Sequence, residues 1–494
     1  MKLKKQLLLA VFIIIAQTAF SQYTADALRF SQFENSTTAR FGGMGGQKAA
    51  IGGDISSVYG NPAGLGMFSK SEFSLTPEIR FGNSDVNFLG TDSKLSNSNV
   101  DLSNVGVVFH TRTYKEGDLK KGLLSLNFGI GYQKRAAYKN NYSFAGETNL
   151  NGLGDFFAQE SNADRLNGTP RAPEDLISNV NNAAFVSFLT DYNAAGNPNY
   201  FPITFTDTDQ TYDVLRSGGS SDVNFSVGTN FSNKVFFGAS VGLSSFRYTS
   251  METTNEQSLY VDPNNGNSVD YNVNYARNFD TEGSGVNLKL GLILKPTKEL
   301  RVGLNFESPT WFRVTDNYSE EFSDRNTGAS ASDSYPFEYN LNTPLKLNGG
   351  LAYFFSDKGF LSADVGFVDY SSIKFSSNNS SQDVSSNRDI MRTYQNVLNY
   401  SVGGEIKLDE SFLLRAGFQS SGNPYKDLNN SDYTINSFSG GIGYRFGEYY
   451  LDAALINSNN FLEYRNYALN NGNEPRAGIE TRTNRVSITF GVRF

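Results

Sequence analysis

The last ten residues of the chain, RVSITFGVRF (485–494), alternate strictly between apolar and polar side chains. The apolar positions are Val486, Ile488, Phe490, Val492 and Phe494. Successive side chains of a β-strand point to opposite faces, so this pattern predicts a strand with one apolar and one polar side. A soluble sandwich and a membrane barrel both use such strands, and the rest of the chain has to distinguish them.

The same alternation recurs along the chain, and its second face is made of small polar residues. Segments 124–133, 223–231, 237–244 and 286–294 place Gly, Ser and Asn opposite their apolar positions. In a soluble sandwich the outer face is richly charged, but charged residues make up only 19% of this chain. The pattern favours a barrel with an apolar face toward lipid and a polar, crowded lumen.

Counting such segments from residue 72 gives about fourteen strands. They are 72–81, 102–112, 122–138, 221–231, 234–252, 283–295, 300–308, 345–355, 359–371, 396–407, 411–420, 434–446, 449–458 and 485–494. Their connections alternate between turns of a few residues and long polar loops. An even number of antiparallel strands with short turns on one side and long loops on the other is typical of outer-membrane barrels. We therefore predict an all-β transmembrane barrel over residues 72–494.

The long connections are predicted to be extracellular, and three of them have a distinct composition. The longest, 139–220, contains apolar residues at helical spacing within 174–192, which predicts an amphipathic helix. The connections 253–282 and 372–395 are rich in Asn, Ser and Asp and are predicted to be mobile and solvated.

Composition excludes several classes of function. The chain has no Cys and one His, His110, so a thiol nucleophile, a Cys-based metal site and a Ser-His-Asp triad are not expected. A net charge of −8 argues against a nucleic-acid partner, whose phosphates require a basic surface. We expect no enzyme, no cofactor and no metal ion.

The first 21 residues have the features of a secretory signal peptide. Lys2, Lys4 and Lys5 precede an apolar run over residues 7–16, and small residues before Gln22 predict cleavage there. The apolar run is about half of the roughly 20 residues that a membrane-spanning helix needs. The sequence therefore predicts export, with residues 22–494 as the mature chain.

Residues 22–71 fit no strand and are predicted to fill the lumen. The segment is rich in Gly, Asp54 is a suitable N-cap, and Pro62 forces Asn61 out of the helical region. Fourteen strands enclose a lumen too wide for side chains alone to fill. We call residues 22–71 the hatch.

The run DISSVYGNPAGL (54–65) resembles the hatch motif of the FadL/TodX family of outer-membrane transporters of long-chain fatty acids and aromatic hydrocarbons. Weaker similarity lies in 300–309 and 349–371. The resemblance implies a fourteen-stranded barrel with the hatch in its lumen and passive uptake of hydrophobic molecules, which enter from the extracellular loops and leave sideways through the wall into the outer-membrane lipid. We expect a monomer. It maps onto the hatch motif residues Asn61, Pro62, Ala63 and Gly64. The terminal Phe494 resembles the signal that the barrel assembly machinery reads.

Two further sets of residues are candidates for a role in transport. A carboxylate ligand requires a cation, and the strand registers place Lys289, Arg301, Lys346, Arg415 and Arg445 in the lumen. The lumenal acids Glu307, Asp364, Glu405 and Asp452 offer the alternative that these cations belong to a structural ion-pair network. Gly129 and Gly131 weaken the third strand and make it a candidate lateral gate.

A second function from a different class also fits the pattern. Similar barrels that bear a hatch hold secreted proteins at the cell surface, as the PorV shuttle component of a Bacteroidota secretion system does. A transporter requires a cavity behind the hatch and an opening in the wall. A docking barrel requires an exposed apolar patch on its loops.

Overall fold

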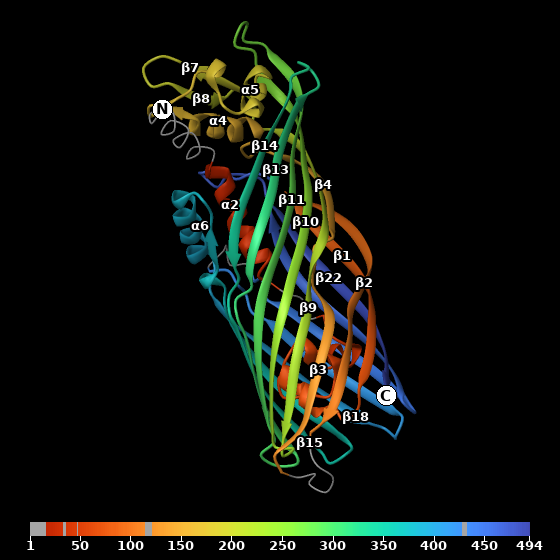
Figure 1. Ribbon diagram of the computed structural model, residues 1–494. Coiled ribbons are helices and arrows are strands. Elements are labelled where there is room, and N and C mark those ends of the chain that lie inside the picture. Colours follow the sequence, from red (N-terminus) through yellow and green to blue (C-terminus); the bar gives the residue numbers. More distant parts are fainter. Residues whose placement is uncertain (1–15, 33–35, 47, 114–120, 427–431) are drawn as a thin grey trace.

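The structure is a computed structural model that describes residues 16–32, 36–46, 48–113, 121–426 and 432–494. Figure 1 shows long tilted strands that curve into a barrel, with helices at one end and on one side. We call the half of the barrel that ends in the short turns the lower half. The half that ends in the long connections is the upper half. Among the described residues, no helix is both long and apolar enough to cross a membrane.

The barrel is all-β and has fourteen antiparallel strands, as predicted, four of them interrupted. The strands are β1 (Glu72–Phe88), β2 (Thr91–Arg112), β3 with β4 (Leu123–Ala137, Asn140–Thr148), β9 (Thr208–Phe231), β10 (Val235–Val261), β11 (Ser268–Leu294), β12 with β13 (Leu300–Glu307, Trp311–Asp324), β15 with β14 (Lys346–Phe354, Ser330–Asn342), β16 with β17 (Gly359–Asp369, Lys374–Ser376), β18 (Asn396–Lys407), β19 (Phe412–Ser421), β20 (Ile435–Phe446), β21 (Tyr449–Tyr464) and β22 (Ala477–Arg493). The barrel closes where β1 pairs with β22, with Phe73 opposite Val492.

The pleat of each strand separates a lipid-type surface from a lumenal one. On β11, Leu288 and Leu290 are exposed on the outside, whereas Asn287 and Lys289 are buried in the lumen. On β10, Phe237, Val241 and Leu243 are exposed near the lower end, whereas the outward positions from Ser245 to Gln257 are polar except for Met251. The exposed apolar side chains form an apolar belt around the lower half of the barrel.

Several strands extend far above this belt. β10 and β11 have 27 residues each, a length of about 90 Å, against a hydrocarbon thickness of about 30 Å. The prediction that 253–282 is a mobile loop is therefore wrong: only the turn between Val261 and Ser268 lies outside the two strands. Above the belt both faces of a strand meet polar surroundings, so its outward positions carry Thr, Asn and Gln and resemble a loop in the sequence.

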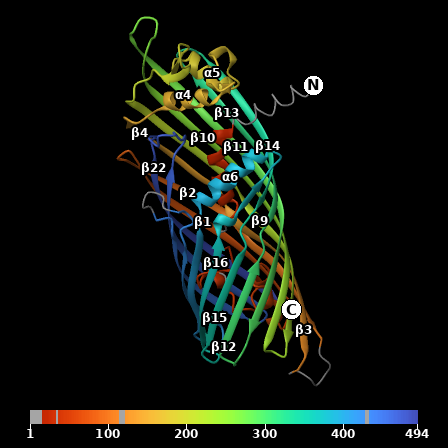
Figure 2. The ribbon, with the colours of Figure 1, turned by 90° about the vertical axis from the view of Figure 1, so that its left-hand side faces the viewer.

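The prediction of a mobile loop over 372–395 is also wrong. The segment contains β17 and helix α6 (Ser380–Thr393), preceded by the short helix η4 (Tyr370–Ser372). Ile373, Phe375 and Ile390 are buried. Figure 2 shows α6 above β16 and beside β14, where it lies over the side of the barrel.

A folded cap covers the upper end of the barrel. It consists of α4 (Leu153–Ala163), β5 (Arg165–Leu166), β6 (Thr169–Pro170), η3 (Pro173–Asp175), α5 (Asn179–Val186), β7 (Thr190–Asn193) and β8 (Asn199–Pro202). The helix predicted over 174–192 is thus shorter than expected, because the chain turns at Phe188 with a positive φ of 59°. Val180 and Ala184 do form its buried face.

Carboxylates from the barrel strands hold the two helices of the cap. Glu256 of β10 accepts hydrogen bonds from the backbone N–H of Leu153 (3.0 and 3.1 Å) at the start of α4. Asp333 of β14 accepts from Ser178 Oγ (2.9 Å) and from the backbone N–H of Val180 (3.0 Å) at the start of α5. A carboxylate at a helix N-terminus satisfies free N–H groups and interacts favourably with the helix dipole.

Candidate functional site

The described residues between Ala16 and β1 lie inside the barrel and form several short helices. They are α2 (Ala16–Arg29), α3 (Ala39–Gly42), η1 (Ile55–Val58) and η2 (Pro62–Met67). Asp54 caps η1, and its side chain accepts from the Ser56 N–H (2.9 Å), as the sequence predicted. The described residues of 36–68 fill the lower half, whereas α2 lies in the upper half. From here on, the hatch means residues 36–68 alone. Residues 1–15 of the predicted signal peptide lie outside the described residues, and its cleavage before Gln22 stays a prediction.

Asn61 of the hatch motif ties the hatch to itself and to the wall. Its Nδ2 donates to the carbonyl oxygens of Ala49 (2.7 Å) and of Leu304 in β12 (3.2 Å). Its Oδ1 accepts from the N–H of Ala63 (3.1 Å) and so caps η2. Pro62, Ala63 and Gly64 are buried in η2.

Glycines on the inner wall make room for the hatch backbone. A Cβ at Gly238 would lie closer than 3.0 Å to the Pro62 carbonyl carbon. The same is true of Gly303 against Ala49 and of Gly403 against Met44. These glycines are needed because two backbones meet at van der Waals distance.

The two candidate gate glycines belong to the same surface. A Cβ at Gly129 would lie 2.8 Å from a methyl group of Val58, and one at Gly131 would lie 2.7 Å from the Tyr59 ring. The pairing of β3 with β2 and β9 continues past both residues, so the described part of the wall has no opening at them in this conformation. Their role as a lateral gate stays a prediction.

Buried ion pairs add to the attachment of the hatch. Arg40 Nε lies 3.0 Å from Glu405 Oε2, and Lys48 Nζ lies 3.4 Å from Asp364 Oδ2. Glu405 also pairs with Arg415 (2.7 Å). Arg415 pairs in turn with Asp452 (2.8 Å), which also pairs with Arg445 (2.9 Å). Arg415 and Arg445 thus belong to an ion-pair network beside the hatch.

Above the hatch lies a cavity of about 1420 Å³. Lys48, Tyr59 and Asn61 line its base, and Phe156 and Gln159 of α4 line its top. Many of the side chains between them are tyrosines: Tyr138, Tyr248, Tyr275, Tyr318, Tyr370, Tyr394, Tyr425, Tyr433, Tyr464 and Tyr467. Burial raises the pKa of Tyr425, in the connection after β19, to about 12, so its hydroxyl is neutral at physiological pH.

A cluster of charged residues, which we call the basal cluster, lies at the lower end of the cavity. Arg135 pairs with Asp222 and with Glu307, both at 2.6 Å. Lys289 Nζ lies 3.7 Å from Asp222 and donates to the Tyr59 carbonyl oxygen of the hatch (2.9 Å). Lys346 of β15 is opposite Glu307 of β12 in the strand register. The basal cluster has three cations and two carboxylates, and therefore a formal charge of +1.

A second charged group crosses the upper part of the cavity. Glu252 accepts from Arg216 Nη2 (2.8 Å), Arg277 Nη2 (2.9 Å) and the Tyr464 hydroxyl (3.1 Å). These side chains come from β9, β10, β11 and β21 and hold opposite walls together. Polar groups thus occupy much of the cavity wall.

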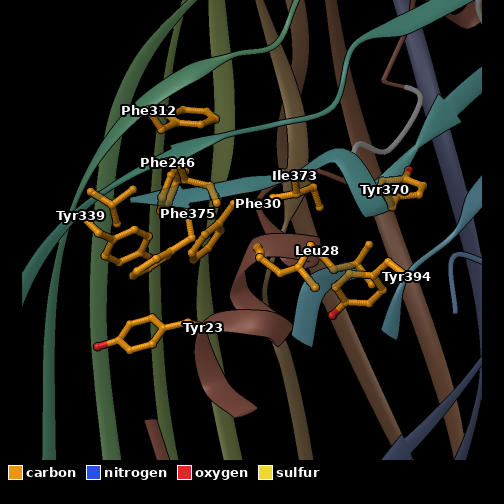
Figure 3. Close-up of a cluster of buried hydrophobic side chains, with 14 of the residues drawn as sticks. Tyr23, Leu28, Phe30, Phe246, Phe312, Tyr339, Tyr370, Ile373, Phe375 and Tyr394 are labelled. Atoms are coloured by element: carbon orange, nitrogen blue, oxygen red, sulfur yellow. The ribbon is translucent and has the colours of Figure 1, made fainter. Parts of the chain in front are cut away.

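An aromatic cluster covers the side of the upper lumen between α2 and the wall (Figure 3). It includes Tyr23, Leu28, Phe30, Phe246, Phe312, Tyr339, Tyr370, Ile373, Phe375, Ile390 and Tyr394. Phe30 stacks on Phe246 with ring centroids 4.0 Å apart, and Tyr23 lies 5.1 Å from Phe375. The Tyr394 hydroxyl donates to the Thr24 carbonyl oxygen (2.8 Å). The other face of α2, with Asp26 and Arg29, lines the cavity.

The remaining predicted residues lie outside the cavity lining. Arg301 stacks against Phe354 at 3.8 Å, and its Nη1 is 3.4 Å from the sulfur of Met67. Phe494 is exposed at the end of the closing strand, where its backbone exchanges two hydrogen bonds with Ser71 (2.9 and 3.1 Å). Its role as an assembly signal stays a prediction. His110 Nδ1 forms a hydrogen bond with Asn127 (2.8 Å).

Sequence reasoning missed both helices that flank the aromatic cluster. Tyr23, Ala27 and Phe30 follow the i, i+4, i+7 spacing of a helix face, which was a usable signal for α2. The buried face of α6 consists of Gln382, Ser386 and Ile390. With one apolar residue, that face has no amphipathic pattern to detect.

The closed barrel, its apolar belt and its filled lumen define an outer-membrane barrel whose cavity is separated from the lower end by an internal hatch. The chain belongs to the family described as outer membrane protein transport protein (OMPP1/FadL/TodX), whose model matches residues 18–457. This is a family of outer-membrane transporters of hydrophobic compounds rather than of enzymes, and membership does not favour the docking alternative.

Solved structures support the fold. A FadL homologue from Pseudomonas aeruginosa is 14% identical, with a TM-score of 0.55 over 94% of this chain and 98% of that one. The toluene transporter TodX from Pseudomonas putida is 16% identical, with a TM-score of 0.50 over 94% and 98%. The CymD monoaromatic hydrocarbon channel is 14% identical, with a TM-score of 0.51 over 93% and 97%. No curated protein sequence matches the chain.

Proposed function

We propose that this transporter takes up amphiphilic acids, molecules with an apolar body and an anionic head such as long-chain fatty acids, in preference to bare hydrocarbons. The observation that carries this proposal is the excess positive charge of the basal cluster. Arg135, Lys289 and Lys346 line the lower end of the cavity together with Glu307. A carboxylate that binds there gains charge-assisted hydrogen bonds.

The rest of the cavity supports the same class of ligand. Tyrosine rings provide apolar area for the body of the molecule, at about 25 cal/mol per Å² removed from water. A pure hydrocarbon can accept no hydrogen bond from their hydroxyl groups or from the polar groups around Glu252, and removing the water that solvates such groups carries a free-energy cost. An amphiphile can accept hydrogen bonds from some of these groups.

Ligand binding to the purified barrel tests the proposal. A long-chain fatty acid and the alcohol of equal chain length would be compared by isothermal titration calorimetry. We expect the acid to bind to the native protein more tightly than the alcohol does. The substitution Lys346→Met should weaken binding of the acid by roughly tenfold or more and leave binding of the alcohol unchanged. Arg301→Met, which removes a cation that does not line the cavity, is the matched control. Equal affinity for acid and alcohol would contradict the proposal.

A further inference from the structure

The upper wall of the barrel is interrupted beside β14. Residues 330–342 of β14 pair with β13 along one edge. Along the other edge, the described chain pairs with β14 only at Asn340, Leu341 and Asn342, through β17. The next strands end at a low level: the β16–β18 ladder stops at Asp369 opposite Asn396, and the β19–β20 ladder stops at Ser421 opposite Ile435.

The free edge of β14 has residues that oppose pairing with another strand. Pro336 lies within it and has no N–H to donate, and Glu338 is exposed two residues further on. Proline and charged residues are the usual means by which natural proteins keep a sheet edge unpaired. The interruption is therefore a feature of the sequence as well as of this conformation.

Helix α6 covers the interruption and is held along its length by side chains: Asp383 accepts from the Ser377 N–H (2.8 Å), and Ile390 packs in the aromatic cluster. Asn387 donates to the Phe375 carbonyl oxygen (2.7 Å) and accepts from the Phe375 N–H (2.9 Å), so this contact is to the neighbouring β17. After the helix, Tyr394 forms a single antiparallel bridge with Tyr425. Among the described residues, α6 forms no backbone ladder with β14 or β20.

The two faces of α6 meet different surroundings. On the inner side Ile390 is fully buried in the aromatic cluster, and Asp389, Arg392 and Thr393 line the cavity. On the outer side Val384 and Met391 are 59% and 55% exposed. Seven residues after Met391, the exposed Leu398 lies at the upper end of β18. Exposed apolar side chains next to basic ones, as at Arg388, suit a membrane–water interface.

The cap covers the top of the cavity, and this favours a ligand route through the side of the barrel. The α4 residues Leu153, Phe156 and Phe157 pack with Tyr275 and Phe322 of the barrel strands in one buried apolar cluster. The cavity therefore ends against α4 at its top and reaches the inner face of α6 at its side.

We propose that α6 is a side door through which an amphiphile at the surface of the outer leaflet enters the cavity. Opening separates α6 from α2 at Tyr394 and Ile390 while the strand ladders stay intact. This inference rests on the proposed uptake function and names its route. It places the opening between β14 and the β18–β20 strands, away from the gate glycines of β3.

A pair of disulfide staples tests the route in a chain that has no native cysteine. Tyr394 and Tyr425 form a non-hydrogen-bonded pair, flanked by the bonds from Gln395 N–H to Pro424 O (2.9 Å) and from Lys426 N–H to Thr393 O (2.8 Å). Side chains are close together in such pairs, so Tyr394→Cys with Tyr425→Cys would lock α6 shut.

A matched staple tests the cap instead. Thr204 and Tyr260 form a bridge of the same type, flanked by bonds from Phe205 N–H to Leu259 O (2.8 Å) and from Val261 N–H to Ile203 O (3.0 Å). Thr204→Cys with Tyr260→Cys would fix the cap on the barrel. The four single-Cys variants show whether either substitution alone disturbs the protein.

The readout is uptake of a fluorescent long-chain fatty acid into vesicles that contain the full-length barrel. Because Tyr394 and Tyr425 line the cavity, each staple is compared only with its own reduced form. We expect oxidation of the α6 staple to abolish the uptake that its reduced form shows, whereas oxidation of the cap staple leaves uptake unchanged. Uptake through the oxidised α6 staple at the rate of its reduced form would overturn the side door.

Hydrogen exchange gives a measure that does not depend on transport. We expect the amides of α6 to exchange faster than those of α4, and the oxidised α6 staple to slow them. If the amides of α6 exchange as slowly as those of the barrel strands, the proposed side door is overturned, whether or not uptake is detected. Absence of uptake in the unstapled protein, together with fast exchange in α6, would instead contradict the proposed function.

Discussion

The lower and upper halves of the lumen are filled in different ways. In the lower half, the hatch backbone packs directly on wall glycines such as Gly238 and Gly303, and Asn61 and Arg40 attach it to the strands. In the upper half, side chains of α2 and α6 form an aromatic cluster beside a cavity of about 1420 Å³.

The difference concerns how each half can move. Where the hatch backbone packs on the wall backbone, no side chain can change its rotamer to make space. The hatch in the lower half is therefore expected to move only as a unit. Aromatic side chains beside a cavity can repack locally. The upper half is therefore where we expect ligand-linked motion.

The largest effect is expected for Arg40→Ala in the lower half. It removes the two charge-assisted hydrogen bonds that Arg40 donates to the buried Glu405 (both 3.0 Å) and leaves Arg415 as the remaining partner. At about 1.5–3 kcal/mol per bond, the free energy of unfolding should fall by about 3–5 kcal/mol. Urea unfolding of the barrel in lipid vesicles measures it. Lys70→Ala is the control, because the Lys70–Glu448 pair (2.8 Å) is about half exposed and such pairs contribute about 0–1 kcal/mol. Equal effects would show that Arg40 does not fix the hatch.

The second-largest effect is expected for Phe30→Ala in the upper half. Phe30 is 1% exposed and stacks on Phe246, so its loss should cost roughly 3 kcal/mol. We expect the loss to appear as faster hydrogen exchange in α2 and α6, with the barrel strands unaffected. Phe205→Ala, at an exposed position of the cap, serves as control. Faster exchange spread over the whole barrel would contradict the separation of the halves.

Gly238→Ala should have an intermediate effect. Its Cβ would clash with the Pro62 carbonyl carbon, and overpacking of this kind costs roughly 1–3 kcal/mol. We expect the hatch to be displaced, seen as higher ion conductance in planar bilayers. Gly440→Ala is the matched control, because the nearest atom to its Cβ is 3.9 Å away. Unchanged conductance in Gly238→Ala would show that the hatch can adjust without leaving its seat.

The smallest effect is expected for Asp333→Asn at the start of α5. The neutral amide retains one acceptor but loses the charge that interacts with the helix dipole, at a cost of about 1 kcal/mol. Limited proteolysis of the cap should become faster, and cavity binding should not change. A global loss of stability would mean that the cap supports the barrel and does more than cover it.

The barrel was predictable from the sequence because lipid imposes a strict pattern. Outward positions such as Leu288 and Leu290 must be apolar in the belt, and the period of two reveals them. Above the belt this requirement ends, so Thr253 and Asn255 of β10 resembled a loop although they belong to the same strand.

The candidate site was predictable only in part. Asn61 stood out through its motif, and Lys289 and Lys346 through their strand register. Which cations reach the cavity depends on how the hatch packs: Arg301 meets Met67, and Arg415 meets Glu405. Helix α6 carries too few apolar residues to be recognised before its neighbours are known.

The closure of the barrel has a consequence for assembly. The hatch precedes β1 in the chain, and β1 pairs with β22, whose ladder continues to Phe494 at the last residue. The ring can therefore close only after β22 has been made, and it must close around a segment that was made first. A hatch left outside at that moment would have to thread through a finished wall. The glycines that seat the hatch must therefore receive it no later than the closing of the seam between β1 and β22.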